Sequence, residues 1–130
     1  MSADTKTVLV VDDDQDTLNV IRMKLEKHPF KVVTTLDGAE ALRLIREQRP
    51  DLIILDVMLP RLSGFKLARL VKFDTKSKGI PLILLTARAR DVDRDLGLEV
   101  GANLYMTKPF DPEQLPRSDF FCRHGPQRIA

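Results

Sequence analysis

The sequence predicts an α/β domain built on a doubly wound sheet of five parallel strands. Along residues 1–115, apolar runs of strand length alternate with longer segments of helical period, which is the pattern of repeated β-α units. The runs are apolar throughout rather than at every second position, as expected for strands that helices cover on both faces. Right-handed crossovers between such strands place helices on each side of one open sheet.

Each strand and helix is expected from its own segment. Runs rich in Val, Ile and Leu predict strands at residues 7–11, 31–35, 51–55, 81–85 and 102–106. Apolar residues at helical spacing predict four helices, marked by Leu18, Ile21 and Leu25, by Ala41, Leu42 and Ile45, by Phe65, Leu67, Ala68 and Val71, and by Val92, Leu96 and Val100. Asp37 and Glu40 resemble a capping box at the start of the second helix, with Asp in place of Ser or Thr.

A fifth helix is expected to be shortened or missing. Asp111 can cap it and Pro112 suits its first turn, but Pro116 follows almost at once. A proline inside a helix costs about 3 kcal/mol or more, and residues 116–130 show no helical stripe. We therefore expect one domain over residues 1–115 and an atypical basic tail or linker stub over residues 116–130.

The composition fits a soluble globular domain of 130 residues, with 43% hydrophobic and 31% charged residues. No apolar run is long enough for a bilayer, no signal peptide is evident, and the lone Cys122 cannot form an internal disulfide. We expect a cytoplasmic location without membrane contact. Three of the 21 basic and one of the 19 acidic residues lie in residues 116–130, so the rest of the chain is balanced. We expect this domain itself to make no nucleic-acid contact.

Polar side chains follow four of the expected strands at the point where each strand ends. They are Asp12 and Asp13 after the first strand, Asp56 after the third, Thr86 after the fourth and Lys108 after the fifth. The carboxyl ends of parallel strands share one edge of the sheet, where open α/β sheets bind their ligands. We expect these side chains to converge there. Clustered carboxylates repel each other until a divalent cation such as Mg²⁺ binds them.

The acidic stretch after the first strand has two other interpretations, and neither fits. Asp12, Asp14 and Asp16 match the start of a calcium loop, but Thr17 stands where that loop needs Gly and Met23 where it needs Glu. The D-x-D pattern of haloacid-dehalogenase-type phosphatases needs Thr or Val where this chain has Asp16. Asp14 and Asp16 are instead expected to cap and stabilise the start of the first helix.

The set of polar residues at the strand ends resembles the receiver domain of two-component response regulators. The resemblance rests on Asp12-Asp13, Asp56 with the following MLPRLSGF, Thr86, and Lys108-Pro109-Phe110 within GANLYMTKPF, and it covers about residues 6–115. It implies a flavodoxin-like sheet of strand order 2-1-3-4-5.

The resemblance also implies the acceptor and the metal ligands. Asp56 matches the aspartate that takes a phosphoryl group from a histidine kinase, a phosphotransfer protein or a small acyl phosphate. Asp12, Asp13 and Asp56 match the ligands of Mg²⁺ (or Mn²⁺), together with the backbone carbonyl of Met58.

The remaining site residues follow from the same resemblance. Thr86 matches the hydroxyl that moves toward the phosphoryl group, small Ala87 beside it leaves room, and Lys108 matches the ammonium that pairs with the group. Tyr105 matches the aromatic residue that turns inward with Thr86. The resemblance also implies a cis peptide bond before Pro109, which would turn Lys108 toward the site.

The predicted function is a phosphorylation-controlled signalling switch that assists its own phosphorylation and dephosphorylation rather than an enzyme with a separate substrate. Its expected partners are a histidine kinase or phosphotransfer protein and a downstream target protein or output domain. The alternative is a pseudo-receiver that binds partners without phosphorylation. In a fold of this kind the fifth helix shares one sheet face with the first, so its loss would leave Val8, Val10 and Leu84 partly uncovered. Such a patch would be covered either by Phe120 and Phe121 of the tail or by a second chain, as in a homodimer.

Overall fold

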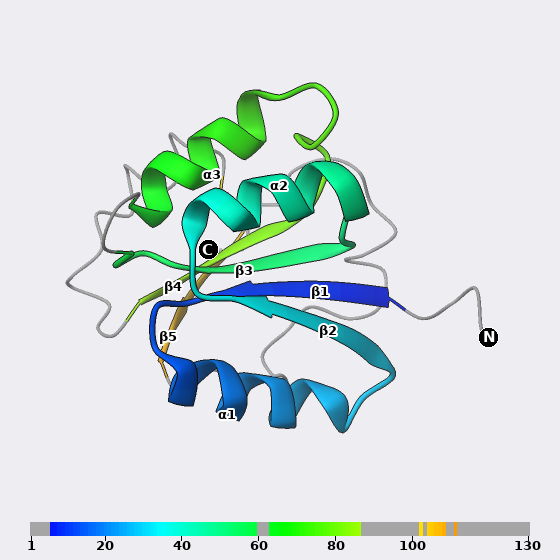
Figure 1. The fold of residues 1–130 in the computed structure, drawn as a ribbon, viewed down its shortest axis with the longest axis vertical. Coiled ribbons are helices and arrows are strands. Elements are labelled where there is room, and N and C mark those ends of the chain that lie inside the picture. Colours follow the sequence, from blue (N-terminus) through cyan, green and yellow to red (C-terminus); the bar gives the residue numbers. More distant parts are fainter. Residues whose placement is uncertain (1–5, 60–62, 87–101, 103, 109–110, 112–130) are drawn as a thin grey trace.

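The computed structural model describes residues 6–59, 63–86, 102, 104–108 and 111. Five parallel strands form one sheet in the order β2-β1-β3-β4-β5, with α1 on one face and α2 and α3 on the other (Figure 1). The strands are β1 (Lys6–Val11), β2 (Phe30–Thr35), β3 (Leu52–Asp56), β4 (Leu82–Thr86) and β5 (Leu104–Thr107). The described helices are α1 (Gln15–Glu26), α2 (Gly38–Gln48) and α3 (Gly64–Phe73). The predicted fold class and strand order are confirmed.

Several predicted features lie outside the described residues. They are the helix marked by residues 92–100, the shortened or missing fifth helix and the tail of residues 116–130. The fifth strand was predicted over residues 102–106, but β5 begins at Leu104, which pairs with Ile83, and extends to Thr107, which pairs with Thr86. None of the helices in the described part of the chain is long and apolar enough to cross a membrane.

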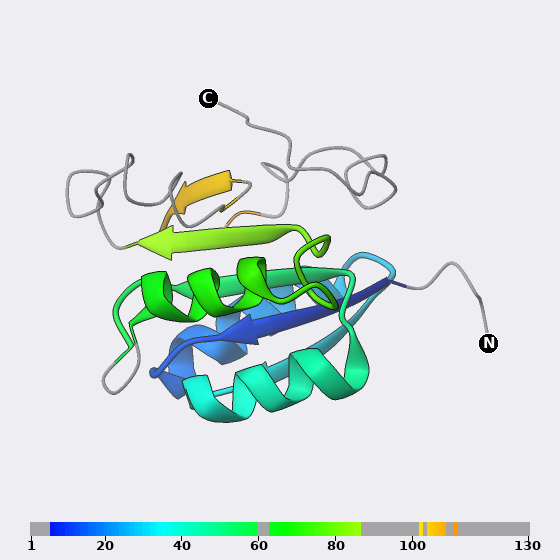
Figure 2. The same ribbon diagram turned by 90° about the horizontal axis from the view of Figure 1, so that it is seen from above.

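Strand side chains alternate between two apolar layers. Figure 2 shows α2 and α3 side by side in front of the sheet and α1 behind it. The layer on the α1 side is formed by Val8, Val10, Leu18, Ile21, Leu25, Leu52, Ile54, Ile83, Leu85 and Met106. The layer on the α2 and α3 side includes Leu9, Val11, Ala41, Ile45, Ile53, Leu55, Leu67, Ala68, Val71, Leu82 and Leu84. Every buried strand therefore needs apolar residues at consecutive positions.

The prediction of a partly uncovered apolar patch is wrong. Val8, Val10 and Leu84 are each 0% exposed. Val8 and Val10 belong to the apolar layer that α1 completes, whereas Leu84 faces the opposite layer. The side-chain period of a strand is two residues, so Leu84 cannot share a face with its neighbours Ile83 and Leu85. The structure thus gives no support to a dimer through these three residues.

Acidic side chains begin α1 and α2. Asp14 is the N-cap of α1 and its side chain accepts a hydrogen bond from the backbone N–H of Asp16, which confirms the predicted capping role for Asp14; Asp16 adds an acidic side chain to the first turn, as predicted for the start of this helix. Asp37 caps α2 in the same way by accepting from the backbone N–H of Ala39. Such caps stabilise a helix by about 1 kcal/mol.

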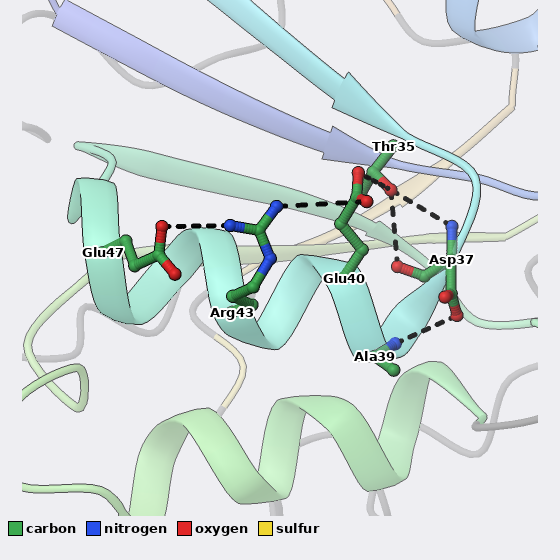
Figure 3. Close-up of polar contacts among 6 residues, drawn as sticks. All are labelled: Thr35, Asp37, Ala39, Glu40, Arg43 and Glu47. Carbon is green, nitrogen blue, oxygen red and sulfur yellow. Dashed lines mark hydrogen bonds and ion pairs between the residues drawn. The ribbon is translucent and has the colours of Figure 1, made fainter.

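The predicted capping box at α2 includes a residue that the sequence pattern did not indicate. Glu40 accepts a hydrogen bond from the Thr35 hydroxyl at 3.2 Å, and that hydroxyl accepts one from the backbone N–H of Asp37 (Figure 3). The buried Thr35 thus stands between the two residues of the box. It also ties the start of α2 to the end of β2, where its carbonyl accepts a hydrogen bond from the backbone N–H of Asp12.

Candidate functional site

Three carboxylates meet at the carboxyl edge of the sheet. Asp56 is the last residue of β3 and Asp12 directly follows β1, and these two neighbouring strands bring the side chains together. One oxygen from each of Asp12, Asp13 and Asp56 lies within 4.8 Å of the others. Asp12 is 1% exposed and Asp56 is 4% exposed, whereas Asp13 is open to solvent. Two buried acids and one exposed acid thus form a cluster open on one side.

The two oxygens of Asp12 have different surroundings. Oδ1 accepts a hydrogen bond from the backbone N–H of Asp14 at 3.0 Å. Oδ2 is buried and lies 3.0 Å from Lys108 Nζ, and no other described residue donates to this oxygen. A buried carboxylate oxygen without a donor is costly unless a cation is nearby. Oxygen ligands of this kind fit a hard cation such as Mg²⁺.

Lys108 brings a positive charge to the cluster. Its backbone N–H donates to the carbonyl of Thr86, which places it at the same edge as Asp12 and Asp56. Its Nζ lies 3.0 Å from Asp12 Oδ2 and 3.7 Å from Asp56 Oδ2. Burial alone would lower the pKa of Lys108, but the two carboxylates outweigh burial and raise it above its ordinary value. The ammonium therefore stays charged at neutral pH.

Among the acids that the structure describes, Asp56 has the most disturbed ionisation. Burial, followed by the negative charge of Asp12, raises the pKa of Asp56 to about 6. The backbone N–H of Met58, which donates to Oδ1 at 3.1 Å, and the charge of Lys108 both act in the opposite direction. Asp13 adds a smaller upward contribution. Nearby positive charge is therefore insufficient to balance the three acids.

The structure describes only some of the other predicted site residues. Thr86 is the last residue of β4 and is buried, so its hydroxyl reaches the same edge. The backbone of Met58 adjoins Asp56, while its side chain is exposed. Tyr105 lies in β5, but its side chain is outside the described residues, as are Ala87 and Pro109 with its predicted cis bond.

Gly64 is a site residue that the sequence interpretation missed. It begins α3, and its backbone N–H donates to the carbonyl of Val57 at 2.9 Å. A Cβ at this position would lie 2.2 Å from the carbonyl oxygen of Asp56, closer than atoms can approach. Only glycine lets α3 start this near to the end of β3. The signal was present in the MLPRLSGF segment, where Gly64 directly follows the helix-capping Ser63.

The arrangement of three carboxylates and a lysine at the sheet edge agrees with what the comparisons find. The sequence model of the response regulator receiver domain family matches residues 8–118 of this chain. The chain belongs to this family. The residues that carried the resemblance, from Asp12 to Lys108, all lie inside the matched range.

A curated relative supports the same assignment. The chain is 41% identical over 110 residues to the alkaline phosphatase synthesis transcriptional regulatory protein PhoP of Bacillus subtilis, and the match covers 85% of this chain and 45% of PhoP. The chain thus spans about half the length of the curated relatives that it matches.

Solved receiver structures share the fold. A putative response regulator from Chloroflexus aurantiacus superposes with a TM-score of 0.79 and 34% identity, covering 85% of this chain and 90% of that one. The receiver domain of the sensor histidine kinase PA1611 from Pseudomonas aeruginosa has a TM-score of 0.75 and 34% identity, covering 82% and 88%. That structure has a magnesium ion coordinated in its active site cleft.

Proposed function

We propose that this chain is a cytoplasmic phospho-accepting receiver in which Mg²⁺-dependent transfer of a phosphoryl group to Asp56 controls binding of a partner. The donor is a histidine kinase or phosphotransfer protein, and the partner is a downstream target protein or output domain. One observation carries the proposal: the oxygens of Asp12, Asp13 and Asp56 converge within 4.8 Å, with a lysine ammonium beside them.

Asp56 is the nucleophile in this proposal. A carboxylate oxygen forms the new bond to phosphorus while the bond between phosphorus and the donor atom breaks, which yields an acyl phosphate. The hydrogen bond from the Met58 backbone N–H holds the carboxylate in one orientation. Because phosphoryl transfer needs mainly positioning and charge neutralisation, a buried and oriented carboxylate is suited to it.

The carboxylates of Asp12, Asp13 and Asp56, with the backbone carbonyl of Met58, would hold Mg²⁺ (or Mn²⁺). The bound ion supplies positive charge that neutralises the oxygens of the transferred group. The buried Oδ2 of Asp12 supports this assignment because, apart from the Lys108 ammonium at 3.0 Å, no described residue donates to it and it can still bind a cation.

Lys108 and Thr86 respond to the new charge on Asp56. Lys108 sits between Asp12 and Asp56 and can move toward a phosphoryl group without leaving the edge. The Thr86 hydroxyl donates a hydrogen bond to a phosphoryl oxygen, and Ala87 leaves room for this movement. Tyr105 follows Thr86 and changes the surface that a partner binds.

Incubation with Mg²⁺ and a small acyl phosphate tests the proposal. We expect the protein to gain the mass of one phosphoryl group in intact mass spectrometry, and Asp56→Asn to gain none because an amide oxygen is a poor nucleophile. A parent protein that stays unmodified would instead be a pseudo-receiver. Steady consumption of the donor without accumulation of modified protein would indicate a phosphatase.

Asp13→Asn and Asp14→Asn provide a matched pair for the metal site. Both residues are exposed acids in the same loop, but Asp14 is committed to capping α1. We expect Asp13→Asn to weaken Mg²⁺ binding in calorimetric titration at least tenfold, and Asp14→Asn to cause little loss of Mg²⁺ affinity, because an asparagine at position 14 can still cap α1. Equal losses of affinity would place Asp14 among the ligands.

A further inference from the structure

The outer face of α3 presents a stripe of four exposed residues, Lys66, Arg69, Leu70 and Phe73, hereafter the α3 stripe. Their spacing of three, four and seven residues puts them on one side of the helix. The opposite side packs into the core. Leu70 is 43% exposed and Phe73 is 72% exposed, so two large apolar side chains lie next to each other on the surface.

The apolar and basic parts of the α3 stripe are in contact. The guanidinium carbon of Arg69 lies 5.7 Å from the centre of the Phe73 ring, which is a cation–π distance. The Arg69 guanidinium thus covers one face of the Phe73 ring, and the rest of the side chain remains open to solvent. Arg residues stacked on aromatic rings are frequent where proteins bind acidic partners.

The positive charge around the α3 stripe is not neutralised by the rest of the described structure. Residues 64–80 hold five basic residues and a single acid, Asp74, which pairs with Arg46 of α2 at 3.7 Å. One of the basic residues, Lys72, points inward and donates to the carbonyls of Lys78 and Ile80. The other four are exposed, and no described carboxylate lies within ion-pair distance of Lys66, Arg69, Lys76 or Lys78.

The neighbouring helix α2 shows the opposite arrangement. Its Arg43 lies between Glu40 and Glu47, at 4.0 Å and 3.0 Å (Figure 3). The basic residue Arg43 of α2 thus has acidic partners on its own helix, whereas Lys66 and Arg69 of the α3 stripe have no acidic partner among the described residues and lie next to exposed apolar side chains. The contrast indicates a surface that complements something acidic.

We propose that the α3 stripe docks an acidic amphipathic helix of a partner protein. Leu70 and Phe73 would contact apolar residues one turn apart on that helix, and Lys66 and Arg69 would face its flanking Asp or Glu residues. A second α3 stripe is disfavoured because its like charges would repel. Nucleic acid is disfavoured because the centre of the stripe is apolar and Lys72 is turned inward. This proposal does not rest on phosphorylation of Asp56.

A synthetic peptide tests this proposal. The probe is a fluorescein-labelled helix with Leu at three- and four-residue spacing and Glu on both flanks, and the control is its scrambled sequence. A single helix face buries less area than a standard interface, so we expect a Kd on the order of 10–100 μM by fluorescence polarisation. Amide shifts in ¹⁵N spectra should centre on residues 64–78.

Surface variants locate the binding. Phe73→Ala and Arg69→Glu should each raise the Kd about tenfold, while their urea unfolding midpoints stay near that of the parent. Met23→Ala on α1 is the matched control, because Met23 is 66% exposed on the other face of the sheet, and it should leave the Kd unchanged.

Four results of the binding experiments would overturn the proposal. They are equal binding of the scrambled peptide, an equal loss of affinity with Met23→Ala, amide shifts away from α3, and tighter binding of α3 to duplex DNA or anionic vesicles than to the acidic peptide. Concentration-dependent dimerisation in sedimentation that Phe73→Ala removes would also contradict it, since the occupant would then be a second copy.

Discussion

The two ends of β3 each carry an aspartate, and the two residues have opposite roles. Asp51 stands just before the strand, where its Oδ2 accepts a hydrogen bond from the backbone N–H of Thr7 at 2.8 Å and its own N–H donates to the Thr7 carbonyl. Asp56 ends the strand among Asp12, Asp13 and Lys108, with its pKa raised to about 6. One aspartate joins two strands, and the other is crowded by like charges.

The difference shows where unfavourable electrostatic energy is concentrated in the domain. At the amino end of β3, a carboxylate satisfies the backbone and stabilises the fold. At the carboxyl end, buried acids repel each other in the absence of a cation, which destabilises the fold but leaves a cluster of oxygen atoms suited to a metal ion. The same residue type therefore serves stability at one end and function at the other.

Gly64→Ala should have the largest effect, because it changes the backbone at the functional end. The new Cβ would meet the Asp56 carbonyl oxygen at 2.2 Å, and no flexible side chain is available to move aside. We expect a loss of about 3 kcal/mol in the free energy of unfolding, measured by urea denaturation, together with reduced Mg²⁺ affinity. Unchanged stability and affinity would show that α3 can shift away from β3 at little cost.

Asp56→Asn should stabilise the metal-free protein by about 2 kcal/mol at pH 7, because it removes a buried charge that Asp12 opposes. The pKa of Asp56 is raised in the folded state, so its protonated form contributes stability that is lost as pH rises from about 4 through 6. The gain from Asp56→Asn should thus be absent below pH 4 and complete above pH 6 in urea titrations. Saturating Mg²⁺ should remove the gain by stabilising the parent.

Asp51→Asn should have the opposite sign at the other end of the strand. An amide oxygen is a weaker acceptor than a carboxylate for the N–H of Thr7, so we expect a loss of about 1 kcal/mol in the free energy of unfolding. Thermal unfolding without Mg²⁺ measures both Asp→Asn variants side by side. A stabilising Asp51→Asn would remove the contrast between the two ends.

Arg49→Gly should give the smallest effect, a gain of about 0.5–1 kcal/mol in urea unfolding. Arg49 ends α2 before the chain enters β3, and its φ of 46° lies in the left-handed region that favours glycine. Pro50 follows and disfavours the right-handed helical conformation at this position. Arg49→Ala keeps the strain and should show no such gain.

The sheet and most of the site could be predicted from the sequence because their signals are local or topological. Continuous apolar runs indicate buried parallel strands, and a polar residue at the end of such a run must lie at the carboxyl edge. These two rules predict that Asp12, Asp56, Thr86 and Lys108 lie at one edge, and the structure places them there.

The features that were not predicted depend on which side of a strand a side chain faces and on close contacts between segments distant in sequence. Leu84 was assigned to the wrong face because continuous runs of apolar residues carry no alternation from which to read the side-chain phase. Gly64 was missed because its importance arises from a backbone brought near it by β3, not from its own neighbours in sequence. The role of Thr35 in capping α2 likewise depends on the angle at which β2 meets the helix.

The dispersal of the acidic cluster and its lysine over β1, β3 and β5 has a consequence for the order of events during folding. Asp12, Asp56 and Lys108 meet only when three strands far apart in the chain have paired through β4. Parallel pairings of this kind are non-local, and they form more slowly than helices do. During synthesis, Asp12 and Asp56 leave the ribosome well before Lys108, so a growing chain carries a pair of unbalanced acids until β5 joins the sheet. The cluster and its lysine are therefore complete only after β5 has paired with β4.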